Sequence, residues 1–200
     1  MTWIEYGQET RHRIVRDLAA SLDGKIIELG ASRRNKILQN SITVDVKKDA
    51  HHVHDLNKGL PFKANTVDNI VACEIIEHMQ SPFAFLKEIK KALKKGGYLI
   101  LTTPNICCLK NRIKILLGKF PINAAMSDFY RYWVDEEDIP QIAHLSDYNI
   151  PHMITALQKV GFEIVDVKSN GVYFRGKLAL PLSITPATWG ENMIIKARML

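Results

Sequence analysis

The chain has 200 residues, of which 46% are hydrophobic and 24% are charged, so it can bury the core of a globular domain and is neither disordered nor fibrous. Its 27 Lys and Arg residues exceed its 21 Asp and Glu residues. The formal net charge of +6 favours anionic ligands or surfaces, but it does not make nucleic acid a partner.

Three cysteines without a CxxC spacing and an N-terminus without the apolar stretch of a signal peptide predict a cytoplasmic protein. No repeat, low-complexity tract or linker interrupts the sequence, which predicts a single domain over residues 1–200.

Helical and strand patterns alternate along the chain. Apolar residues at helical spacing predict an opening helix over Gln8–Leu22, within the first 24 residues. Short apolar runs bounded by turn residues predict strands at Lys25–Leu29, Ser41–Val46, Val67–Cys73, Gly97–Thr103 and Phe162–Lys168, with a further short one at His51–His54. Helices are expected at Pro82–Lys95, after Ser81 as N-cap, and at Ile106–Leu117 and Pro151–Val160. This order predicts an α/β fold whose mainly parallel sheet has helices on both faces and binds ligands at the carboxyl ends of its strands.

Acidic residues and a glycine lie at the ends of the first two expected strands. Glu28 precedes Gly30 by two positions, and Asp45 ends the next strand 15 positions after that glycine. The single glycine and the short spacing disfavour a dinucleotide site, because the pyrophosphate fingerprint needs several glycines at a helix N-terminus. A carboxylate such as Asp45 can accept hydrogen bonds from ribose hydroxyls, although a turn-forming role is an open alternative.

Several segments together resemble the small, type 11-like class I S-adenosylmethionine-dependent methyltransferases. They are ELGAS, TVDV, HDLNKGLPF, NTVDNIVACEIIEHM, FLKEIKKALKKGGYLILTTPN and GFEIVDV, within about Lys25–Lys168. The resemblance implies a Rossmann-like, mainly parallel seven-stranded sheet with an antiparallel last strand at Asn192–Arg198, and S-adenosylmethionine as cofactor.

The same resemblance assigns the cofactor site. It implies cofactor contacts for Glu28, Gly30, Ala31, Ser32, Asp45, Val46, Asp55, Leu56, Cys73 and Glu74. The first four would lie against the amino-acid part of the cofactor, Asp45 would hold the ribose hydroxyls, and Asp55 and Leu56 would flank the adenine. Ser32 stands where many members have a second glycine, and the helix that follows is shortened to about Arg33–Gln39.

Two histidines are candidates for acid–base chemistry. Methyl transfer is an in-line displacement that needs no nucleophile from the enzyme, but an oxygen or carbon acceptor needs a base. His78 and His144 have the right chemistry, while loop-holding hydrogen bonds are the alternative for His78. The histidines at 51, 52 and 54 have no Cys or further His ligands nearby in the sequence, so no metal site is predicted.

The acceptor would be bounded by two inserts, 119–149 and 169–190. The first holds the aromatic run Lys119–Trp133, suited to a lid or to core packing, and the second is suited to a pocket wall, a homodimer contact or a membrane-facing surface. Leu109–Lys119 combines basic and apolar residues and could rest on anionic lipid or cover the sheet.

The sequence therefore predicts methyl transfer from S-adenosylmethionine to a small-molecule acceptor, such as a sugar, a quinone-like molecule or a lipid-linked molecule. The alternative is a non-catalytic S-adenosylmethionine-binding regulatory or scaffold module, suggested by the altered Gly30–Ser32 loop. A nucleic-acid substrate is disfavoured, because the chain reads ACEIIEHM where base-amino methyltransferases carry Asn/Asp-Pro-Pro-aromatic, and because it has no Pro-Cys pair.

Overall fold

The computed structural model describes residues 3–122, 124, 144–174, 177–178 and 184–200. Its main feature is a seven-stranded sheet in the order β3-β2-β1-β4-β5-β9-β6. The strands are β1 (Ile26–Leu29), β2 (Ile42–Asp45), β3 (His52–Val53), β4 (Val67–Cys73), β5 (Leu93–Pro104), β6 (Phe162–Ser169) and β9 (Asn192–Met199). Only β9 of these seven runs antiparallel to its neighbours, β5 and β6, so the predicted Rossmann-like sheet with an antiparallel last strand is confirmed.

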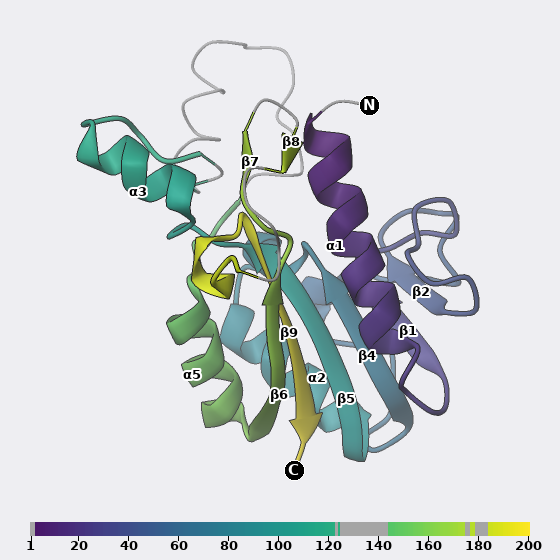
Figure 1. The fold of residues 1–200 in the computed structure, drawn as a ribbon. Helices are drawn as coiled ribbons and strands as arrows, with labels where there is room; N and C mark the ends of the chain where they lie inside the picture. Colours follow the sequence, from purple (N-terminus) through teal and green to yellow (C-terminus); the bar gives the residue numbers. More distant parts are fainter. Residues whose placement is uncertain (1–2, 123, 125–143, 175–176, 179–183) are drawn as a thin grey trace.

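Helices cover both faces of this sheet, as predicted. On one face, α1 (Trp3–Ala19) lies across the sheet (Figure 1). Its Val15 and Leu18 belong to one core cluster with Val71 of β4 and Ile100 of β5. On the other face, α2 (Pro82–Ala92) and α5 (Ile150–Val160) contribute to the larger core, and their buried residues include Phe85, Leu86, Ile89, Met153 and Leu157. Burial on both sides explains the nearly continuous apolar runs of the central strands.

Several helix boundaries differ from the sequence prediction, and the helix predicted over Ile106–Leu117 spans Leu109–Leu116. The opening helix begins at Trp3 and ends at Ala19, and residues 20–22 form a turn in which the N–H of Leu22 donates to the carbonyl oxygen of Ala19 (3.0 Å). The helix predicted over Pro82–Lys95 ends at Ala92, and Ser81 precedes it without a side-chain capping hydrogen bond. Leu93 is fully buried and pairs with Val67 of β4, so sheet pairing overrides the helical pattern there.

The short helix predicted over Arg33–Gln39 does not form, and this segment consists of turns. Asn35 Oδ1 accepts the N–H of Ser32 (2.6 Å), and the carboxylate of Glu28 accepts the N–H groups of Ile37 and Leu38 (2.8 Å each). Side chains that bind backbone N–H groups locally offer the chain an alternative to a helix. The sequence prediction was therefore wrong at this loop.

Several short elements lie at or near the carboxyl edge of the parallel strands. They are α3 (Leu109–Leu116), β7 (Tyr173–Phe174), β8 (Lys177–Leu178) and the 3-10 turns η1 (Leu56–Lys58), η2 (Ile76–His78) and η3 (Ala187–Trp189). Figure 1 shows α3, the β7–β8 hairpin and the N-terminal end of α1 together beyond the end of β5.

The predicted insert 119–149 falls largely outside the described residues, and so do its aromatic residues Phe129, Tyr130, Tyr132 and Trp133. Within the part of the chain that the structure describes, no helix combines the length and the apolar character that a membrane crossing requires.

Candidate active site

A cavity of about 220 Å³ opens at the carboxyl ends of β1 and β4. The residues that line it come from three segments: Gln8, Arg11 and His12 of α1; Glu28, Leu29, Gly30, Ala31, Asn35 and Ile37 of β1 and its loop; and Val71, Cys73 and Glu74 of β4. The predicted cofactor residues Glu28, Gly30, Ala31, Cys73 and Glu74 therefore share one cavity. The α1 residues were missed by the sequence analysis, because their helical pattern gives no sign of which loop they face.

Gly30 lets the backbone turn tightly at the end of β1. Its φ is +73°, and its N–H donates to the carbonyl oxygen of Val44 (2.8 Å). A Cβ at this position would lie 2.9 Å from Cδ1 of Ile75. Both the conformation and the space therefore require glycine, which leaves the backbone open to a ligand.

Glu28 lines the cavity and also shapes the loop beside it. In addition to the N–H groups of Ile37 and Leu38, its carboxylate accepts the hydroxyl of Ser41 (2.5 Å). Only 2% of Glu28 is exposed. The N–H and hydroxyl groups of Ser32 both donate to Asn35 Oδ1, which fixes the loop without a helix.

The other predicted cofactor residues lie next to this cavity along the same edge of the sheet. Asp45 ends β2, is 8% exposed and accepts the N–H of Lys47 through Oδ1 (2.9 Å), while Val46 after it is exposed. Asp55 caps η1 by accepting the N–H of Asn57 (3.0 Å), and Leu56 is buried. Because β3, β2 and β1 are neighbours, these residues extend the edge beyond Gly30.

Glu74 joins three elements at the end of β4. Its Oε2 lies 3.1 Å from Nη1 of Arg11 and accepts Nδ2 of Asn192 (2.7 Å), and its Oε1 accepts the hydroxyl of Thr102 (2.8 Å). Its φ of +51° is unusual for a residue with a side chain and costs on the order of 1–3 kcal/mol. These contacts hold Glu74 in that conformation and explain why it persists.

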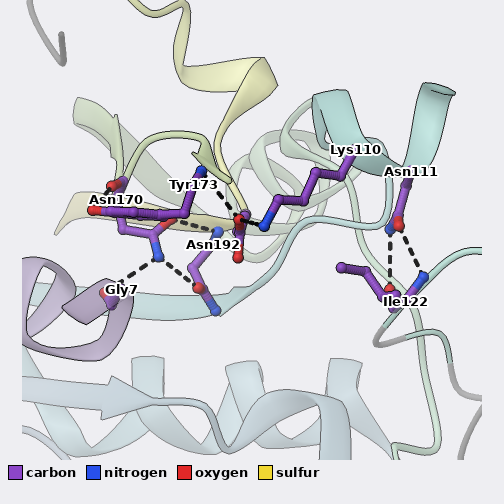
Figure 2. A network of polar contacts seen from close by, with 8 residues as sticks. Gly7, Lys110, Asn111, Ile122, Asn170, Tyr173 and Asn192 are labelled. Carbon is purple, nitrogen blue, oxygen red and sulfur yellow. Dashed lines mark hydrogen bonds and ion pairs between the residues drawn. The ribbon is translucent and has the colours of Figure 1, made fainter. Parts of the chain in front are cut away.

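The network continues from Asn192 to the second insert (Figure 2). Asn192 donates its N–H to Oδ1 of Asn170 (2.8 Å), and Nδ2 of Asn170 donates to Oδ1 of Asn192 (2.9 Å) and to the carbonyl oxygen of Gly7 in α1 (3.4 Å). Lys110 of α3 pairs with Glu191 at 2.5 Å. The insert, α1 and β9 are thereby tied together.

Two cavity residues have strongly shifted pKa values. Burial, and then the positive charge of Arg11, lower the pKa of His12 to about 4, so this imidazole is neutral near pH 7. Burial raises the pKa of Cys73 to about 12, which keeps its thiol protonated.

A second polar cluster lies next to Glu74. Glu77 and His78 belong to η2, and His144 approaches them because the carbonyl oxygen of Glu77 accepts the N–H groups of Leu145 (2.7 Å) and Ser146 (3.3 Å). The rings of His78 and His144 have centroids 5.0 Å apart. The structure thus brings together the two histidines that the sequence selected.

Glu77 is the member of this cluster that the sequence analysis missed. It is 1% exposed, and Oε2 accepts the hydroxyl of Thr103 (2.9 Å). Burial, and next the negative charge of Glu74, raise the pKa of Glu77 to about 8. A ligand atom from each of Glu77, His78 and His144 lies within 4.8 Å of the others.

The histidines near β3 have separate contacts. His51 Nδ1 accepts the N–H of Thr43 (3.1 Å), His54 Nε2 contacts the carbonyl oxygen of Gly59 (3.1 Å), and the ring of His52 lies edge-on to Phe62 with centroids 5.5 Å apart. Hydrogen bonds and ring packing thus account for these three side chains.

Comparison with known proteins agrees with this geometry. A family model described as a methyltransferase domain matches residues 2–167, so the chain belongs to the methyltransferase domain family. Its fold and matching relatives define a class I S-adenosylmethionine-dependent methyltransferase, with S-adenosylmethionine as the cofactor.

The individual relatives are distant. A Mycolicibacterium smegmatis protein described as a probable S-adenosylmethionine-dependent methyltransferase is 19% identical over 135 residues, which are 68% of this chain and 48% of that protein. The chain thus spans about half the length of this curated relative. A Thermotoga maritima methyltransferase structure has a TM-score of 0.68 and 17% sequence identity. The match covers 99% of this chain and 93% of the Thermotoga chain. A complex of a methyltransferase with the Haloferax volcanii Trm112 activator gives a TM-score of 0.57 and 14% identity, covering 96% and 91%.

Proposed function

We propose that the chain transfers a methyl group from S-adenosylmethionine to a small-molecule acceptor that enters beside Glu77, His78 and His144. The observation that carries this proposal is the adjacency of two sites. The cavity ends at Glu74, and the cluster of Glu77, His78 and His144 begins three residues later. When bound, the cofactor supplies a sulfonium methyl group that an acceptor displaces in line, so the protein mainly has to position the two molecules.

The residues at the cavity fit this cofactor. Arg11 and Glu74 offer opposite charges, which suit the carboxylate and ammonium of the amino-acid part, and neutral His12 adds no further charge. The backbone at Gly30 has no side chain that would fill the space, and Asp45 offers a carboxylate to the ribose hydroxyls.

His78 and His144 are suited to take a proton from the acceptor. Imidazole titrates near neutral pH, and a positioned base of this kind contributes about 10²–10⁴-fold to rate. The Thermotoga protein is described as a possible histamine N-methyltransferase, which supports a small molecule as the acceptor class. Sugars, quinone-like molecules and lipid-linked molecules are the acceptors to screen first.

The decisive experiment combines binding with turnover. Calorimetric titration of the full chain with S-adenosylmethionine and S-adenosylhomocysteine is expected to show saturable binding. Radiolabelled methyl transfer across an acceptor panel is then expected to give a product. Binding without turnover on any acceptor would favour the non-catalytic module, and absence of binding would overturn the proposal.

We further propose that α3 contacts an anionic membrane surface. Its apolar residues Ile115 and Leu116 are 58% and 85% exposed, and Leu117 after it is 65% exposed. Among the residues of α3 only Asn111 is buried, so the helix does not cover the sheet as the sequence alternative proposed. Lys114 adds positive charge beside this apolar surface, which suits an interface with anionic lipid. A lipid-linked acceptor would then be presented near the site.

A further inference from the structure

We propose that Glu77, His78 and His144 form a binding site for a divalent metal cation. The sequence predicted no metal site, because only the histidines at 51, 52 and 54 were weighed as ligands. In the structure these three histidines form hydrogen bonds and a ring contact. The tertiary structure instead gathers two imidazoles and one carboxylate, whose ligand atoms lie within 4.8 Å of one another.

This ligand set has a recognisable chemistry. Two histidines with one carboxylate supply three ligands to a catalytic cation and leave positions open for water or a substrate. Imidazole nitrogen favours transition-metal cations such as Zn²⁺, Fe²⁺ and Co²⁺ over Mg²⁺ and Ca²⁺, which prefer oxygen ligands. The site therefore suits a divalent transition-metal cation.

The carboxylate of Glu77 provides an independent observation. Glu77 is 1% exposed, and its Oε1 is buried without a hydrogen-bond partner among the described residues. Its other oxygen, Oε2, is held by the hydroxyl of Thr103 at 2.9 Å. Leaving a buried carboxylate oxygen without a partner is costly, and a cation between the three side chains would supply one.

The backbone prepares this geometry without a metal. Glu77 and His78 are adjacent on η2, and the carbonyl oxygen of Glu77 accepts two N–H groups from the residues directly after His144. The hydroxyl of Thr103 donates a hydrogen bond to Oε2 of Glu77. Residues behind a metal ligand commonly orient it by hydrogen bonds of this kind. The ligands thus come from two distant segments that main-chain hydrogen bonds hold together.

The cation would narrow the class of acceptor, an extension that rests on the proposed methyl transfer. A cation at an open site polarises a bound oxygen and makes its proton easier to lose. The acceptor would then present a hydroxyl oxygen to the cation. The oxygen–methyl bond would form as the sulfur–methyl bond of S-adenosylmethionine breaks, with S-adenosylhomocysteine as the leaving group. Because His78 and His144 would serve as ligands in that arrangement, the hydroxyl proton would pass to water and not to either imidazole.

The test is direct metal binding to the full, untagged and chelator-treated chain. Calorimetric titration with Zn²⁺ is expected to show one strong saturable site, and Co²⁺ is expected to give a visible absorption band that saturates at one equivalent. Exposed histidines elsewhere would add only weaker binding. A wild-type chain that binds neither cation at this stoichiometry would overturn the proposal.

Matched variants locate the cation. Glu77→Gln, which keeps an oxygen for Thr103, and His144→Ala are each expected to weaken Zn²⁺ binding at least about tenfold and to abolish the Co²⁺ band. The controls Glu163→Gln and His152→Ala change exposed residues of the same types and are expected to bind as the wild type does. Equal binding by all four variants would contradict the proposal, provided that circular dichroism shows each one folded.

S-adenosylhomocysteine titration of the same samples separates this proposal from the proposed function. Cofactor binding without metal binding would remove the metal site and leave methyl transfer with histidine as the base. Metal binding without cofactor binding would keep the metal site and remove the methyl-transfer proposal.

Discussion

Glu74 shows how much of the site depends on single side chains. It combines a left-handed backbone conformation with contacts to Arg11, Thr102 and Asn192, which come from α1, β5 and β9. The resemblance to class I methyltransferases predicted Glu74 to lie in the cofactor wall. Its partners could not be predicted, since they are far away in the chain and carry no shared motif.

Asp45 provides a prediction about cofactor affinity. Replacement by Ala is expected to weaken S-adenosylhomocysteine binding about 10- to 100-fold, because hydrogen bonds to a charged group contribute about 1.5–3 kcal/mol. Calorimetry measures the effect. Asp17→Ala, which removes an exposed aspartate of α1, is the matched control and should bind as the wild type does. Unchanged affinity in Asp45→Ala would place the ribose elsewhere.

His12 provides a prediction about pH. The folded chain lowers its pKa from 6.5 to about 4, so between these values the unfolded chain binds more protons than the folded one. The contribution of this group to stability is therefore complete above pH 6.5 and declines as the pH falls towards 4. Urea unfolding at pH 7.5 and pH 5 should show a smaller loss of stability in His12→Gln than in the wild type.

The exposed His152 serves as the comparison for this pH effect. His152→Gln should lose as much stability between pH 7.5 and pH 5 as the wild type does. If His12→Gln and His152→Gln behave alike, His12 is not the group responsible.

At the scale of elements, the loop after β1 is the main departure from the sequence prediction. The carboxylate of Glu28 accepts two backbone N–H groups of this loop, and the side chain of Asn35 accepts one. These N–H groups are therefore bound by side chains and not by the carbonyl groups of a helix. The loop that lines the candidate cofactor cavity is therefore a turn held by side chains. The sequence showed that this segment was short, but local propensity could not show that a carboxylate on β1 would capture its backbone.

Gly30 tests whether that turn must have its observed shape. Gly30→Ala would put a Cβ on a residue with a left-handed backbone conformation, 2.9 Å from Cδ1 of Ile75. It is expected to lower both the free energy of unfolding and the affinity for the cofactor. Gly118 has a similar φ of +63° but nothing within 4 Å of its Cβ position. Gly118→Ala thus measures the backbone cost alone, about 1–2 kcal/mol.

Crowding at Ile75 should make Gly30→Ala less stable than Gly118→Ala by about 1–3 kcal/mol. Urea denaturation gives both values, and calorimetry with S-adenosylhomocysteine gives the affinities. Equal destabilisation by the two substitutions would show that the loop relaxes away from the added methyl group.

At the scale of the whole molecule, charge and shape act together. The chain has a formal net charge of +6, and α3 lies at the carboxyl edge of the sheet (Figure 1). Apolar side chains of α3 are exposed there. We expect the protein to bind vesicles that contain anionic lipid and to bind them less as salt screens the charges. Vesicle co-sedimentation measures this.

A charge placed on α3 separates a specific surface from general attraction. Leu116→Glu should reduce vesicle binding, because it puts a carboxylate among the exposed apolar residues of α3. Val165→Glu makes the same change at an exposed residue of β6 and should have a smaller effect. Equal loss in both variants would indicate that net charge alone governs the binding.

The sequence by itself determined the class of fold and the edge of the sheet where the candidate site lies. Periodicity is a local property that records which side of each element is buried, so strands such as Val67–Cys73 were predicted at their observed bounds. Residues at or directly after the ends of strands, including Gly30, Asp45 and Glu74, follow from that order because parallel strands end at a common edge.

Only the tertiary structure decided which distant residues meet there. His144 reaches His78 through hydrogen bonds to the carbonyl oxygen of Glu77, and Asn192 reaches Glu74 because β9 inserts between β5 and β6. Burial of Glu77 likewise depends on how these elements pack. Such contacts join segments far apart in the chain, and a local pattern specifies the face that a residue occupies without specifying its partner across the fold.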